Sequence, residues 1–298
     1  MPMFRKTFAA LMALLMLLTS CALAEENRAL PLGGPAPNPP VWEAYSEDKR
    51  VYDDGTMRVV ITSDVVHDTN VYYAYVKLTD PSQLRTALAA KYPSKAVQPV
   101  AVMAQENNAV FAINGDFFSY HRSGVVVRSG KYLRESPVSS RDTLIIDKNG
   151  DFHILTNSNQ KTWKAVRDIA VEAFCFGPAL IVDGVVQQFK IPDKVSCGAR
   201  TEAQRLCICQ LGTLEYLIIA TEGPEQEKTD GFTIAQLTEL AVAAGAKHCY
   251  NLDGGSSVTL QMGDTKINAV DSKNRYVGDI IYFATLVGEG EAWEAMEP

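Results

Sequence analysis

One amphipathic helix pattern constrains the fold of this chain more than any other feature of its sequence. Thr233 to Ala244 is predicted to form a helix that begins at a capping box of Thr233 and Gln236 and ends before Gly245. Apolar residues recur every three or four positions along it, at Ile234, Leu237, Leu240, Ala241 and Ala244. One apolar stripe of this kind predicts a helix that buries a single side.

Apolar strand patterns lie on both sides of this helix. Leu214 to Ala220 precedes it, and His248 to Leu252 follows it. A strand–helix–strand crossover predicts two parallel strands, and ligands of such units gather beyond the carboxyl ends of the strands. Glu222-Gly223 follows the first strand, and Asp253-Gly254-Gly255 follows the second. We therefore expect two acidic, glycine-rich loops on one rim.

Strand patterns dominate the rest of the chain. The expected strands are Met57 to Ser63, Val71 to Lys77, Ala109 to Ile113, Gly124 to Arg128, and Thr143 to Leu155 with a hairpin turn at Asn149-Gly150. Two more helices are predicted, Ser82 to Lys91 behind the cap Asp80-Pro81, and Val100 to Asn107. The pattern predicts an α+β fold, a mixed β-sheet with a few packed helices that include one strand–helix–strand crossover.

The composition is that of a folded chain and argues against polyanionic partners. The 298 residues are 47% hydrophobic and carry a formal net charge of −7, from 35 acidic and 28 basic side chains. Low hydrophobicity combined with high net charge keeps chains disordered; this chain has neither and can bury a sizeable core. Nucleic acids and anionic membranes select clustered Lys and Arg, and no basic run follows the first residues. We therefore expect no nucleic-acid partner.

The first residues have the pattern of an export signal. Arg5 and Lys6 precede an apolar run from Phe8 to Leu18 that is too short to span a bilayer. Two processing routes stay open, because cleavage at Ala22-Leu23-Ala24 would release the chain, whereas lipidation of Cys21 would tether it. We expect a secreted or cell-envelope protein, with membrane contact only through a lipid anchor at Cys21.

The chain divides into four expected segments. Residues 1–24 are the signal peptide, and residues 25–44 are a linker, because residues 31–40 hold five prolines and two glycines. Residues 45–288 are the folded domain, and residues 289–298 are an acidic tail.

The cysteines are interpreted as small buried hydrophobic side chains. Beyond Cys21 they are Cys175, Cys197, Cys207, Cys209 and Cys249. Their number is odd, and no Cys-x-x-Cys or Cys/His metal spacing occurs. Cys207 and Cys209 alternate along an apparent strand, so we expect them to share one face. The histidines are scattered, although His121 is close enough in sequence to reach the loop that follows Ile113.

Two Asn-x-Asp sequences follow strand patterns and supply candidate site residues. Asn114-Gly115-Asp116 ends one helix–strand order, and Asn251-Leu252-Asp253 ends another, which suggests an internal pseudo-repeat with two loops across one cleft. A plain Asx turn is the alternative for the first sequence.

A glycine- and serine-rich loop follows the second Asn-x-Asp. Gly254, Gly255, Ser256 and Ser257 allow N–H groups to converge as an anion-binding nest; a flexible turn is the alternative. Arg205 begins an apolar run and offers a fixed cation for an anionic ligand, with a surface salt bridge as the alternative.

Three blocks, in this order, resemble those of the phosphodiester glycosidase family. They are residues 112–118 (AINGDFF), residues 177–180 (GPAL) with Asp183-Gly184, and residues 251–257 (NLDGGSS). The resemblance extends from about Tyr45 to Leu286, and the last block is the most specific. The chain departs from the family pattern at Leu206, Cys209 and Glu222, where Glu222 replaces an Asp.

The resemblance implies an exported hydrolase that cleaves a sugar-1-phosphodiester at the anomeric carbon, in cell-envelope or extracellular glycans. The implied catalytic residues are Asp116, Asp253 and Glu222. The implied substrate-binding residues are Asn114, Gly115, Arg205, Gly254, Gly255, Ser256 and Ser257. No cofactor is implied.

Two alternatives stay open for these residues. A non-catalytic envelope protein could bind anionic glycopolymers through the same glycine-rich loop. A metal-dependent phosphodiesterase could hold a divalent cation on the carboxylates of Asp116, Asp253 and Glu222.

Overall fold

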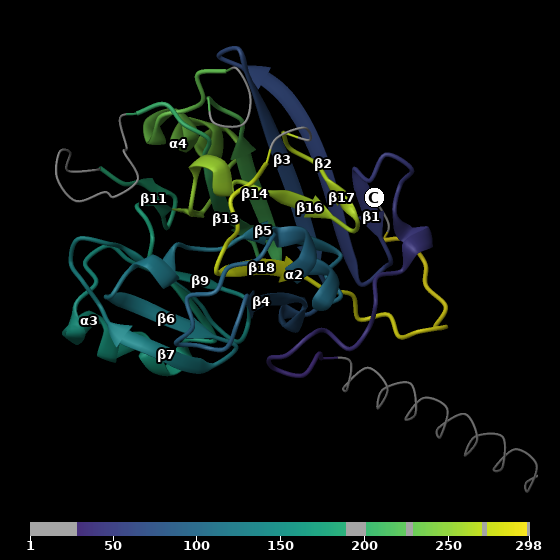
Figure 1. Ribbon diagram of the computed structural model, residues 1–298, viewed down its shortest axis with the longest axis horizontal. Coiled ribbons are helices and arrows are strands. Elements are labelled where there is room, and N and C mark those ends of the chain that lie inside the picture. Colours follow the sequence, from purple (N-terminus) through teal and green to yellow (C-terminus); the bar gives the residue numbers. More distant parts are fainter. Residues whose placement is uncertain (1–28, 189–200, 225–228, 270–272, 297–298) are drawn as a thin grey trace, which may run out of the picture.

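Two β-sheets that pack face to face form the centre of the molecule, and a third sheet closes one end (Figure 1). The computed structural model describes residues 29–188, 201–224, 229–269 and 273–296. Among the helices of these ranges, none combines the length and the hydrophobicity that a membrane span requires.

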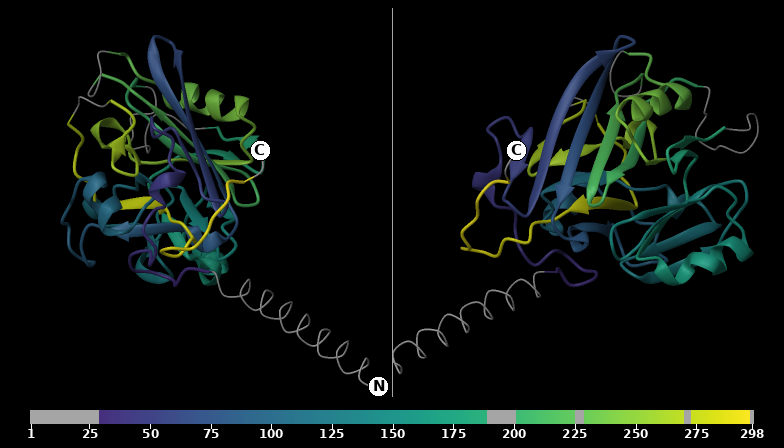
Figure 2. Two further views of the ribbon diagram at one scale, coloured as in Figure 1. Left: turned by 90° about the vertical axis from the view of Figure 1, so that its right-hand side faces the viewer. Right: turned by 180° about the vertical axis from the view of Figure 1, so that it is seen from behind.

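The first sheet has eight strands in the order β1-β2-β3-β14-β13-β15-β11-β12. They are β1 (Val51–Asp53), β2 (Met57–Val66), β3 (Thr69–Leu78), β14 (Glu215–Thr221), β13 (Leu206–Gly212), β15 (His248–Asn251), β11 (Ala179–Val182) and β12 (Val185–Val186). In Figure 2 the long β2 and β3 run side by side along this sheet.

The second and third sheets have five strands each. The second sheet has the order β17 (Thr265–Lys266), β16 (Leu260–Met262), β5 (Phe111–Asn114), β18 (Asp279–Phe283) and β4 (Leu84–Leu88). The third has the order β7 (Lys131–Ser136), β6 (Gly124–Arg128), β10 (Glu172–Phe174), β8 (Thr143–Ile146) and β9 (Phe152–Leu155).

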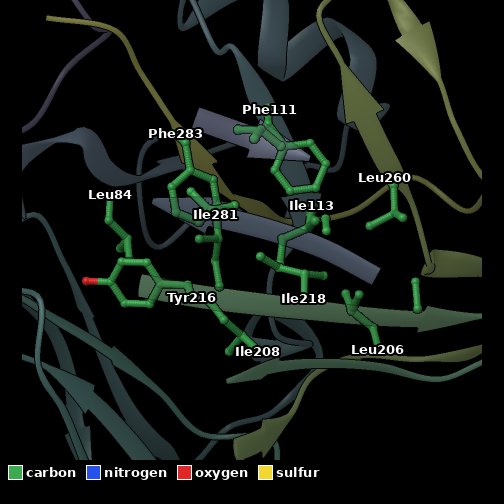
Figure 3. Packing of buried hydrophobic residues seen from close by; sticks show 14 of the residues in the cluster. Leu84, Phe111, Ile113, Leu206, Ile208, Tyr216, Ile218, Leu260, Ile281 and Phe283 are labelled. Carbon is green, nitrogen blue, oxygen red and sulfur yellow. The ribbon is translucent and has the colours of Figure 1, made fainter. Parts of the chain in front are cut away.

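Continuous apolar runs form the central strands because both faces of these strands are buried. In β13, Leu206 and Ile208 face the core between the first two sheets, whereas Cys207 and Cys209 face the opposite side. In β18, Ile281 and Phe283 face that same core, whereas Ile280 faces away. Side chains alternate along a strand, so a strand covered on both faces needs apolar residues at every position. Figure 3 shows Leu206 and Ile208 of the first sheet on the side that faces Ile281 and Phe283 of the second.

Each outer face is covered by one helix. α4 (Ile234–Ala243) packs on the first sheet, α2 (Val100–Glu106) on the second, and α3 (Gln160–Val166) on the third. Short 3₁₀ turns complete the described elements: η1 (Trp42–Ala44), η2 (Pro81–Gln83), η3 (Phe118–Tyr120), η4 (Arg167–Ile169) and η5 (Gly255–Ser257). The fold is therefore predominantly β, and the three α-helices within the described ranges agree with the expected few packed helices.

The two strands of the predicted crossover, β14 and β15, are parallel as expected, but another strand lies between them. β14 and β15 each pair antiparallel with β13, so they are parallel to each other with β13 between them. The predicted capping box of α4 is present, because Thr233 Oγ1 accepts a hydrogen bond from the Gln236 amide at 3.2 Å. The hairpin at Asn149-Gly150 is also confirmed, since β8 pairs antiparallel with β9.

The predicted helix from Ser82 to Lys91 is wrong, although its cap is correct. Asp80 caps the single turn η2, and the chain then continues as β4, which pairs along its whole length with β18. A cap and a proline favour the first turn only, and cross-strand pairing decides the conformation of the residues after that turn. The predicted helix from Val100 to Asn107 is confirmed as α2.

The proline-rich segment packs on the folded domain over its described part. Leu30 and Ala36 are buried with α2 and β18, and the carbonyl oxygens of Pro31 and Gly34 accept hydrogen bonds from Arg85. Packed structure therefore begins within the expected linker of residues 25–44. Trp293, within the expected acidic tail, also packs against the central core.

Candidate active site

The two Asn-x-Asp loops lie against each other in the structure. β5 ends at Asn114 in the second sheet, and β15 ends at Asn251 in the first. The Asn114 side-chain amide donates to the Asp253 carbonyl at 2.8 Å, and the Asp253 amide donates to the Gly115 carbonyl at 3.4 Å. The two loops therefore lie together through direct hydrogen bonds, whereas the cleft expected between them stays a prediction. Asn114 acts here as the link between them, because its side-chain oxygen also accepts from the Thr259 amide at 3.1 Å.

Asp116 is held in place by three donors. One carboxylate oxygen accepts from the Phe118 amide and from Arg128 Nη2, both at 3.1 Å, and the other accepts from the Cys175 amide at 2.8 Å. Only 1% of its side chain is exposed. These contacts fix the carboxylate within the protein and leave little of it to reach a ligand directly.

A buried arginine joins Asp116 to a second acid. Arg128 Nε and Nη2 donate to one carboxylate oxygen of Asp279 at 3.0 and 2.5 Å, while Nη2 also bonds Asp116. All three side chains are at most 3% exposed. Burial raises the pKa of Asp279 above its ordinary value, although Arg128 opposes the shift. Sequence patterns assign no role to Arg128 or Asp279.

Gly115 is required by the close approach of Asp279. A β-carbon at position 115 would lie 2.5 to 2.6 Å from the Asp279 carboxylate atoms. The Gly115 amide also donates to the Asp279 carbonyl at 3.0 Å. The contribution of Gly115 is therefore space for the buried acid, in addition to the turn.

Asp253 is the acid that lies nearest to solvent. Its side chain is 10% exposed, and Arg275 Nη2 contacts both carboxylate oxygens, at 3.2 and 3.4 Å. Burial raises the pKa of Asp253 to about 6, while Arg275 and a hydrogen bond from Ser257 act in the opposite direction. Such a carboxyl group changes its charge near neutral pH, as general acids and bases in enzymes do.

Arg275 also organises the glycine-rich loop. Its Nε donates to Ser257 Oγ at 2.8 Å, Nη2 donates to the Gly254 carbonyl at 3.3 Å, and its amide donates to the Ser256 carbonyl at 2.8 Å. Its side chain is 39% exposed, and its guanidinium lies 5.1 Å from the centre of the Phe117 ring. Phe117 in turn stacks on Tyr120, with ring centres 4.1 Å apart. A partly exposed cation thus lies between the loop and an aromatic pair.

The expected nest is partly used by internal contacts. The Gly255 amide donates to the Gln204 carbonyl at 3.0 Å, and the Ser257 amide donates to the Gly254 carbonyl at 3.3 Å. A β-carbon at position 254 would meet the Gln204 carbonyl oxygen at 2.6 Å, so this glycine permits a close approach to the chain before β13. The loop holds its shape through these bonds, and Arg275 supplies the positive charge beside it.

Comparisons with known proteins agree with the three blocks identified in the sequence. The profile of the phosphodiester glycosidase family matches residues 107–284, which is more than half of the chain. This chain belongs to the phosphodiester glycosidase family. A comparison with curated protein sequences gave no match.

Two solved structures share the fold of this phosphodiester glycosidase family member. One is the catalytic domain of zebrafish N-acetylglucosamine-1-phosphodiester alpha-N-acetylglucosaminidase, auto-inhibited by its pro-peptide, with a TM-score of 0.62, 13% identity, and coverage of 81% of this chain and 86% of that one. The other is a hypothetical protein from Synechocystis, with a TM-score of 0.52, 14% identity, and coverage of 78% and 63%. At these identities the similarity is one of fold.

Glu222 and Arg205 lie beside the loops but are occupied by structural contacts. Glu222 is 2% exposed and accepts hydrogen bonds from Tyr72 Oη and Asn70 Nδ2, both at 2.6 Å, and from the Ala269 amide at 3.0 Å. Arg205 is 3% exposed, and its guanidinium donates to the carbonyl oxygens of Phe232 and Thr201. Their roles in catalysis and phosphate binding stay predictions, and these contacts favour structural roles instead.

The three carboxylates do not assemble a metal site in this family member. Within the described ranges, the one group of three or more His, Cys, Asp or Glu side chains with ligand atoms within 4.8 Å of one another is Cys207, Cys209 and Cys249. Asp116, Asp253 and Glu222 therefore do not converge on one ion as the metal-dependent alternative requires.

Several polar atoms around the site have no hydrogen-bond partner among the described residues. They are His121 Nε2, Arg141 Nη1, Asn251 Oδ1 and Asp279 Oδ1. His121 lies against Phe117, with ring centres 5.8 Å apart, and burial together with the charge of Arg141 lowers the pKa of its imidazole. Buried polar atoms are rarely left unpaired in the absence of a functional reason.

Sequence patterns identify His121 as a neighbour of the site but miss Arg128, Asp279 and Arg275, because each of these lies outside the recognised blocks.

Proposed function

We propose that this chain is an exported hydrolase that cleaves a sugar-1-phosphodiester at the anomeric carbon, within cell-envelope or extracellular glycans. The observation that carries the proposal is the pairing of a titratable carboxyl group, Asp253, with a partly exposed guanidinium, Arg275, at the contact of the two Asn-x-Asp loops. Family membership supports a hydrolase of this class. The export-signal pattern predicted from the first residues of the sequence supports the proposed location.

The phosphate end of the substrate is assigned to Arg275 and the loop beside it. A phosphate monoester leaves readily as an anion, so the enzyme must hold negative charge more than it must donate a proton. Arginine binds phosphate oxygens through a planar set of N–H donors. Ser257 Oγ accepts from Arg275 Nε at 2.8 Å and so helps to hold this guanidinium beside the loop.

The anomeric carbon is assigned to Asp253. In its charged form this carboxylate can take a proton from the attacking water or stabilise the positive charge that develops on the sugar ring. Asp116 is nearly inaccessible and is therefore assigned an indirect role. Its negative charge adds to the effect of burial in raising the pKa of Asp253. The Asn114 side-chain amide donates to the Asp253 carbonyl at 2.8 Å, and this bond holds the backbone that carries the carboxylate.

The first test is hydrolysis of an N-acetylglucosamine-1-phosphodiester, the substrate class named for the zebrafish relative, beside a panel of cell-wall sugar-1-phosphodiesters. Release of reducing sugar by the purified chain is expected, with and without a chelator. Asp253→Asn should lower kcat at least a hundredfold, whereas Asp64→Asn, on an exposed part of β2, should leave it unchanged.

Three results would contradict the proposal. Binding of the glycans without turnover would favour the envelope-binding alternative. Loss of activity with the chelator would favour metal-dependent cleavage. Wild-type rates in a folded Asp253→Asn variant would remove this residue from the mechanism.

A further inference from the structure

Three cysteine side chains meet on the face of the first sheet that α4 covers. Cys207 and Cys209 lie on β13, and Cys249 lies on the neighbouring β15. All three are 0% exposed, and their sulfur atoms lie within 4.8 Å of one another. Their surroundings are apolar, with Leu180 and Ile219 in the same cluster. The catalytic proposal uses none of these thiols.

The strand register places two of these cysteines opposite each other. Cys209 pairs directly with Cys249 in the antiparallel ladder of β13 and β15. The Leu252 amide donates to the Leu206 carbonyl at 2.9 Å, so Leu206 and Leu252 form a hydrogen-bonded pair. Hydrogen-bonded and non-hydrogen-bonded pairs alternate along such a ladder, which makes Cys209 and Cys249 a non-hydrogen-bonded pair.

This type of pair suits a covalent cross-link between strands. Its Cα atoms are about 4.5 Å apart in a regular ladder, which is within the range of about 4.4 to 6.8 Å that disulfides span. The Sγ atoms of Cys209 and Cys249 are 2.7 Å apart, whereas Cys207 Sγ lies 3.9 Å from Cys209 Sγ. Two thiolates on one zinc ion would be about 3.8 Å apart at the usual Zn–S length. The closer pair therefore fits a disulfide better than a shared metal ion.

We propose that Cys209 and Cys249 form a disulfide that joins β13 to β15, with Cys207 as a free thiol beside it. Each cysteine loses its proton and one electron, and an external disulfide accepts the two electrons and two protons and is reduced to two thiols. The predicted export route leads to compartments where such oxidants act. Because the pair is buried beneath α4, the bond forms during folding, before the helix covers the sheet.

The bond would connect the two strands that support the proposed site. β15 runs directly into Asn251 and Asp253, and β13 begins directly after Arg205. The cross-link would also enclose β14, Glu222 and the whole of α4 in one covalent loop. The proposal does not depend on the activity of the site.

Peptide mapping of the full chain, exported to an oxidising compartment, tests the proposal. The protein is denatured with iodoacetamide and no reductant, and then digested with trypsin. Cleavage after Arg205, Lys228, Lys247 and Lys266 gives peptides 206–228 and 248–266. These two peptides are expected as one linked species that separates on reduction. Fragment sequencing across Ile208 shows which cysteine of peptide 206–228 is bonded.

Cysteine variants identify the bonded pair without relying on fragment sequencing. Cys207→Ala and the control Cys175→Ala should keep the linked species, whereas Cys209→Ala should remove it. The proposal is overturned if both peptides of the wild type are fully alkylated without reductant. It is also overturned if the bond maps to Cys207, or if metal analysis finds one zinc ion per chain with all three thiols reduced.

Discussion

Asp116 and Asp253 occupy equivalent places in the two Asn-x-Asp loops, yet their environments give them different roles. Asp116 accepts three hydrogen bonds from within the protein and is almost inaccessible. Asp253 faces a partly exposed arginine and has a pKa of about 6. The sequence predicts both acids from the repeated motif. It does not distinguish them, because the difference comes from Arg128 and Arg275, which lie at unrelated places in the chain.

The pH dependence of the proposed hydrolysis should follow Asp253. If Asp253 is needed as a carboxylate, kcat/KM should rise with pH through about 6 and then level off. Arg275 lowers the pKa of Asp253 against the larger effect of burial, so Arg275→Ala should shift this rising limb to higher pH and raise KM for the phosphodiester. Arg275→Lys keeps the positive charge, so its kcat/KM should rise at nearly the same pH as in the wild type. Profiles of kcat/KM from about pH 4 to pH 9 measure these shifts. If kcat/KM rises at the same pH in the wild type and in Arg275→Ala, the assignment is contradicted.

A methyl group at position 115 should disrupt the site through Asp279. Gly115→Ala would bring a β-carbon to about 2.5 Å from the Asp279 carboxylate, and we expect a loss of about 1 to 3 kcal/mol in the free energy of unfolding. Urea unfolding measures this loss. Gly212→Ala is the matched control, because the nearest atom there belongs to the flexible Glu215 side chain, 3.1 Å away. Equal stability of the two variants would show that the Asp279 contact can relax.

At the scale of elements, local sequence signals predict where strands and helix caps lie better than they predict which strands are neighbours in a sheet. The sequence predicts a strand from Gly124 to Arg128, which are the bounds of β6, and it predicts the capping box of α4 from Thr233 and Gln236. The sequence did not predict that β13 lies between β14 and β15. The order of strands in a sheet depends on contacts far apart in the chain, which no local pattern encodes.

The cap of α4 offers a direct test of one local signal. Thr233→Ala removes the side chain that accepts from the Gln236 amide, and we expect about 1 kcal/mol of destabilisation in the free energy of unfolding. Thr213→Ala, in the turn before β14, is the control and should cost less than half as much. Thermal or urea unfolding measures both. Equal losses would mean that burial of the α4 apolar side, rather than its cap, fixes where the helix begins.

At the scale of the whole molecule, the proposed site forms where all three sheets meet. Asp253 follows β15 of the first sheet, Asp279 begins β18 of the second, and Arg128 ends β6 of the third. The bonds from Arg128 to Asp116 and Asp279 therefore depend on the docking of the third sheet against the second. This convergence could not be predicted from sequence, because Arg128 and Asp279 are 151 residues apart.

A second buried acid, Glu172, also forms a hydrogen bond between the third sheet and the second. Glu172, on β10 of the third sheet, accepts from Thr86 Oγ1 on β4 of the second sheet at 2.7 Å, and from the Ser129 amide at 3.0 Å. Burial raises the pKa of Glu172 to about 7 from an ordinary value of 4.5, although Arg128 opposes the shift. The folded state thus binds this proton more tightly than the unfolded state does.

The docking of the third sheet should therefore weaken as the pH rises. An acid whose pKa is higher in the folded state contributes its full stability below about pH 4.5 and loses it as the pH passes 7. The shift corresponds to roughly 3 kcal/mol of unfolding free energy. Glu172→Gln carries no charge at any pH, so relative to wild type it should gain about that much stability between about pH 5 and pH 8. Urea unfolding of both proteins at the two pH values measures the difference. A constant difference between them would mean that Glu172 titrates at its ordinary pKa and does not link sheet docking to pH.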